Sequence, residues 1–76
     1  MASFKETLAQ AYHRSQVGGD QAGAIADLRA VLRDEKMKTA AHAELKRLDA
    51  FMRSMRGRRG CAISRTMHDL LVGAFQ

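Results

Sequence analysis

Apolar side chains recur along this chain every three or four residues, the spacing that places them on one face of a helix. Ser3 and Glu6 have the spacing of a capping box, in which the serine hydroxyl accepts from the glutamate amide. We expect a helix over about residues 4–16, ended by Gly18 and Gly19, because glycine readily adopts the left-handed conformation. The apolar face of this helix holds Phe4, Leu8, Ala11 and Tyr12.

A second amphipathic segment predicts a helix over about residues 21–35, with Asp20 as its N-cap. Gly23 lies in its first turn, where glycine costs roughly 1 kcal/mol relative to alanine. We therefore expect the first helix to approach closely at Gly23, and the two helices to form an antiparallel hairpin. The apolar face holds Ala24, Ile25, Leu28, Val31 and Leu32.

Part of this hairpin, residues 19–32, resembles the second helix of a tetratricopeptide unit. The matching positions are the turn glycine, the small residue and the large apolar residues, namely Gly19, Ala24, Leu28 and Leu32. Val31 is bulkier than the usual alanine, and the first helix lacks the Trp and Gly signature of that family. The chain holds one such unit, whereas such repeats need about three for stability, so we interpret the segment as a generic helical hairpin.

The third segment is the most strongly periodic part of the chain. Residues 36–38 have the character of a short link, and Thr39 can cap a helix over about residues 40–55. The apolar side of this helix holds Ala41, Leu45, Leu48, Phe51, Met52 and Met55. Its opposite side holds Lys46, Asp49, Arg53 and Arg56.

A glycine-bracketed turn at residues 57–60 leads to a fourth expected helix, about residues 64–75, which begins near Ser64 or Thr66. Thr66 and Asp69 have the spacing of a capping box. The apolar stripe holds Ile63, Met67, Leu70, Leu71, Ala74 and Phe75. The whole pattern predicts an all-α fold, a small bundle of three to four short helices in a single domain, residues 1–76.

The size of the chain bounds its stability. A chain of 76 residues buries on folding roughly 60% of its unfolded surface, so its stability is marginal and a homodimer is one remedy. The apolar face expected to serve self-association holds Phe51, Met52, Met55, Met67 and Phe75.

The expected localisation follows from the single cysteine and from the lack of a membrane-spanning or signal-peptide pattern. Cys61 is the only cysteine, which favours a reducing compartment. No apolar run approaches the roughly 20 residues that cross a bilayer, and the first residues lack the basic-then-apolar order of a signal peptide. We therefore expect a cytoplasmic protein without membrane contact.

The distribution of charge along the chain is the sequence feature that bears most on function. Between Asp49 and Asp69 lie five arginines and no acidic residue. Removing these five from the 13 Lys and Arg leaves eight basic residues against eight acidic ones, so the net charge of +5 comes from this stretch. Such a concentration indicates a surface for an anionic partner. The expected partner-binding residues are Arg53, Arg56, Arg58, Arg59 and Arg65.

Nucleic acid is the first expected partner, because guanidinium groups bind phosphate oxygens in bidentate fashion. Residues 61–71 resemble the start of the recognition helix of a helix-turn-helix protein. That resemblance implies that Ile63, Met67 and Leu70 pack, while the residues facing DNA are Ser64, Arg65, Thr66 and His68. A solvated charged loop is the alternative interpretation of the arginines.

A different class of function is an inhibitor or adaptor, of the kind that phages and other mobile elements encode, which docks on an acidic surface of a larger protein machine. Either function is non-enzymatic. The sequence shows no catalytic motif, and His13, His42 and His68 lack metal-ligand spacing with one another or with Cys61. We therefore expect no catalytic residues, no cofactor, no metal and no small-molecule substrate.

Overall fold

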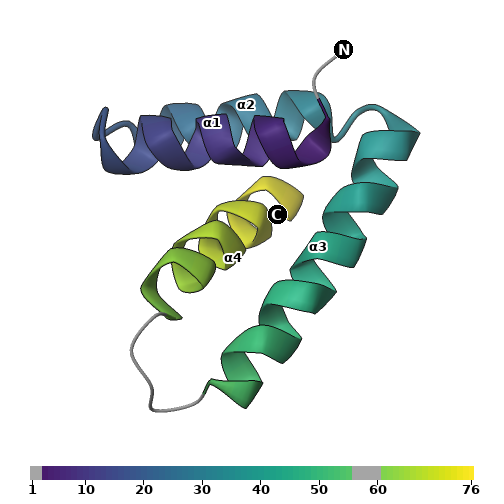
Figure 1. Ribbon diagram of the computed structural model, residues 1–76. Helices are drawn as coiled ribbons and strands as arrows, with labels where there is room; N and C mark the ends of the chain where they lie inside the picture. The colour runs from purple at the N-terminus through teal and green to yellow at the C-terminus, as the bar shows by residue number, and fades with distance from the viewer. Residues whose placement is uncertain (1–2, 56–60) are drawn as a thin grey trace.

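The computed structural model describes residues 3–55 and 61–76, which form four helices in two pairs (Figure 1). The helices are α1 (Phe4–Gln16), α2 (Gln21–Val31), α3 (Glu35–Ser54) and α4 (Cys61–Phe75). Helices α1 and α2 form an antiparallel hairpin that lies across one end of the α3–α4 pair (Figure 1). The all-α fold and the N-terminal hairpin are therefore confirmed.

The caps of the hairpin follow the sequence closely. The Ser3 hydroxyl accepts from the Glu6 amide at 3.3 Å, which opens α1 as a capping box predicts. Gly19 has a φ of 67°, the left-handed conformation that reverses the chain after α1. The Asp20 carboxylate accepts from the Gly23 amide at 2.9 Å and opens α2.

The junction between α2 and α3 differs from the prediction. Helix α2 ends at Val31, not at residue 35, and α3 begins at Glu35, not at residue 40. The cap is Asp34, whose carboxylate accepts from the Lys36 amide at 2.9 Å, and the expected link at residues 36–38 lies inside α3. The Thr39 hydroxyl donates to a carbonyl within this helix. An acidic cap also complements the helix dipole, which explains why Asp34 is used.

Helix α4 also begins earlier than expected, at Cys61. Thr66 is not its cap, because the Thr66 hydroxyl donates to the Ala62 carbonyl one turn earlier, at 3.0 Å. Ser64 and Thr66 therefore lie inside the helix, and the expected capping box with Asp69 is absent.

The core is built around α4, which packs against α1, α2 and α3 of its own chain (Figure 1). Helix α3 makes most of its contacts with α4 and few with the hairpin. Two side-chain contacts support this arrangement: Arg29 donates to the Gly73 carbonyl at 3.1 Å, and His42 stacks on Phe75 at 4.4 Å between ring centroids. The buried core holds Phe4, Leu8, Ala11, Ala24, Leu28, Ala41, Leu48, Leu70, Leu71 and Ala74.

Truncation of α4 in the core should destabilise the whole fold. Leu70 is fully buried, so Leu70→Ala should lower the free energy of unfolding by about 2–5 kcal/mol through lost burial and a cavity. Val17 is 72% exposed, so Val17→Ala should change the free energy of unfolding by about 0.5 kcal/mol or less. Urea denaturation followed by circular dichroism measures both. Equal effects of the two substitutions would contradict the central position of α4.

Candidate functional site

The two described residues of the expected arginine surface, Arg53 and Arg65, lie where the α3–α4 pair extends beyond the core. The buried and packed residues reach Leu48 on α3 and Met67 on α4. Beyond these points lie residues 51–55 and 61–66, which we call the distal end. In Figure 1 the distal end is the end of the α3–α4 pair away from the α1–α2 hairpin.

Two of the five expected arginines belong to the described part of the chain, and both are exposed. The side chain of Arg53 is 80% exposed and pairs with Asp49 at 3.1 Å. An exposed pair of this spacing is worth about 0.3–0.5 kcal/mol, too little to withhold Arg53 from an external anion. Arg65 is exposed, without an ion pair to any described residue. The remaining three lie outside the described residues: Arg56, Arg58 and Arg59.

Helix geometry directs both described arginines away from the core. Arg53 follows the buried Leu48 by five residues, and Arg65 precedes the buried Leu70 by five residues. At 3.6 residues per turn, five residues correspond to about 140° around the helix. Each arginine therefore projects from the outer flank of its helix.

Apolar side chains also remain exposed at the distal end. Ile63 is 55% exposed and Phe51 is 38% exposed, while Met52 and Met55 are half-buried. Ile63 lies four residues before Met67, so it continues the packed stripe of α4. The expectation that Ile63 packs is wrong, because the stripe extends past the described residues that could cover it.

The face expected to serve self-association does not form one surface. Phe75 stacks on His42 at the opposite end of α4. Twelve residues of helix separate Phe75 from Ile63, which is about 18 Å along the axis. Met67 packs against the core. Phe51 is exposed near the end of α3, far along the fold from Phe75, so Phe75 gives no support to a homodimer through this face.

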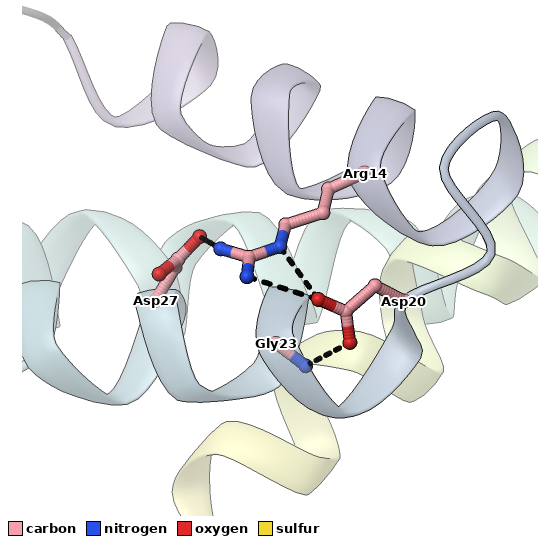
Figure 2. Close-up of polar contacts among 4 residues, drawn as sticks. All are labelled: Arg14, Asp20, Gly23 and Asp27. Atoms are coloured by element: carbon pink, nitrogen blue, oxygen red, sulfur yellow. Dashed lines mark hydrogen bonds and ion pairs between the residues drawn. The ribbon is translucent and has the colours of Figure 1, made fainter.

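One charged cluster that the sequence did not predict joins the two helices of the hairpin (Figure 2). Arg14 contacts Asp27 at 2.7 Å and Asp20 at 2.9 Å. A Cβ atom on Gly23 would come within 2.6 Å of the Arg14 guanidinium, so the expected close approach is confirmed, through a side chain of α1. The two aspartates raise the pKa of Arg14 through hydrogen bonds and charge. The cluster is a structural clamp, distant in sequence from the distal end.

A second unexpected group is Glu44, which is only 8% exposed. Its carboxylate accepts from Arg47 Nε at 3.0 and 3.1 Å. These hydrogen bonds lower the pKa of Glu44, with help from the charge of Lys5, although burial opposes the shift. The sequence did contain an indication that Glu44 is buried, because Glu44 lies three residues after Ala41 and four before Leu48, on the same face of the helix. A partly buried carboxylate fully engaged by arginine is a structural element.

The described residues form no metal-binding cluster. Among residues 3–55 and 61–76, no group of three His, Cys, Asp or Glu side chains could hold a metal ion. The Nδ1 atom of His68 comes within 3.8 Å of an Asp69 carboxylate oxygen, at the limit of an ion pair. In the same part of the chain, no helix is long and apolar enough to cross a membrane.

No protein-family model matches this chain, and no curated protein or solved structure gives a significant match. The resemblances to a tetratricopeptide unit and to a helix-turn-helix protein therefore depend on the quoted residues alone. For the latter, Leu70 is buried, Met67 packs and Arg65 is exposed as implied. Ile63 was expected to pack but is exposed. Apart from Arg65, the residues expected to face DNA are half-buried: Ser64, Thr66 and His68.

Two carboxyl groups make the fold sensitive to acid. The Gly23 amide, followed by Arg14, lowers the pKa of Asp20, whose ordinary value is 3.8, and Arg47 lowers that of Glu44, ordinarily 4.5. A group whose pKa is lowered by folding stabilises the fold above its unfolded pKa, and this contribution is lost as the pH falls through the folded value. Stability should therefore fall as the pH drops below about 4.5.

The variant Glu44→Gln isolates one of these groups. It should be less stable than the parent chain at pH 7, and the difference should shrink as the pH falls from about 5 to about 2. Urea denaturation across this pH range measures it. Glu35→Gln, at an exposed carboxyl group, controls for loss of one negative charge. A difference between Glu44→Gln and the parent that does not change with pH would refute the role of the Glu44 charge.

Proposed function

We propose that this chain is a small, non-enzymatic inhibitor or adaptor that docks on an acidic surface of a larger protein through its distal end. One observation carries the proposal: exposed apolar side chains, Phe51 and Ile63, lie at the same end as the exposed Arg53 and Arg65. Arginine, methionine and aromatic residues are the types enriched at the centres of protein interfaces. A phosphate backbone would engage the arginines and leave the apolar side chains in water.

The acidic character of the partner follows from the charge of the chain. The segment between Asp49 and Asp69 supplies the entire net charge of +5. Complementary charge speeds encounter and selects against wrong partners. Burial of the neighbouring apolar side chains then supplies the lasting affinity, at roughly 25 cal/mol for each Å² removed from water.

Affinity purification of the tagged chain, with and without nuclease treatment, tests the proposal. A protein partner should remain after nuclease treatment. It should be lost from a chain carrying Phe51→Ser and Ile63→Ser, and retained by Val17→Ser, which changes a more exposed apolar residue elsewhere. Loss of the partner after nuclease, or its retention by the double variant, would contradict docking through the distal end.

Nucleic-acid binding is a second candidate, favoured by the concentration of all net charge in one stretch. Arg58→Ala with Arg59→Ala should weaken binding to duplex DNA or RNA. It should also flatten the dependence of log K on log salt by about 1.8, if both residues contact phosphate. Lys36→Ala with Lys38→Ala removes the same charge from exposed positions at the start of α3. Absence of any binding in a mobility-shift assay at low salt removes this candidate.

A further inference from the structure

We draw no further inference here: the strongest candidate, the exposed apolar patch of Phe51 and Ile63 at the distal end of the α3–α4 pair, carries none, because nothing in the structure shows what covers it.

Discussion

Burial of the C-terminal half of α4 is the interaction on which the rest of this structure depends. Leu70 and Leu71 are fully buried, and the helix that carries them packs against three other helices. The α1–α2 hairpin has its own clamp in Arg14 and its two aspartates, but α3 has little contact with that hairpin. Helix α3 is therefore held in place mainly through α4, and the last helix of the chain organises those that precede it.

This dependence explains the form of the distal end. Two helices packed on each other extend beyond the core, so their apolar stripes continue past the described residues that could cover them. The arginines that lie on the outer flanks of the same helices share this end. The arginines differ in how firmly carboxylates hold them: Arg14 contacts two aspartates and Arg47 contacts the buried Glu44, whereas Arg53 has one exposed pair with Asp49. Arg65 has no ion pair to a described residue.

The differences between the expected and observed elements have local physical causes. The period of apolar residues located every helix, but helix ends depend on which polar side chain captures a free amide. Asp34 competed with Thr39 for that role, and the acidic side chain opened α3 one turn earlier. At the start of α4 the Thr66 hydroxyl was satisfied by the Ala62 carbonyl, so it capped nothing. Glu44 shows a further limit of reading burial from apolar residues. It lies on the buried face of α3 with Ala41 and Leu48, but its charged side chain does not mark the position as buried.

By itself the sequence determined the all-α class, the hairpin with its glycine turn and the concentration of net charge between Asp49 and Asp69, because each is a property of local spacing or composition. Only the tertiary structure decided how far each apolar stripe is covered. It buried Leu70, left Ile63 exposed and placed a carboxylate beside the core, because coverage depends on where other helices end. Apolar residues at helical spacing predict one face of a helix, and the packing of the other helices decides which part of that face stays exposed.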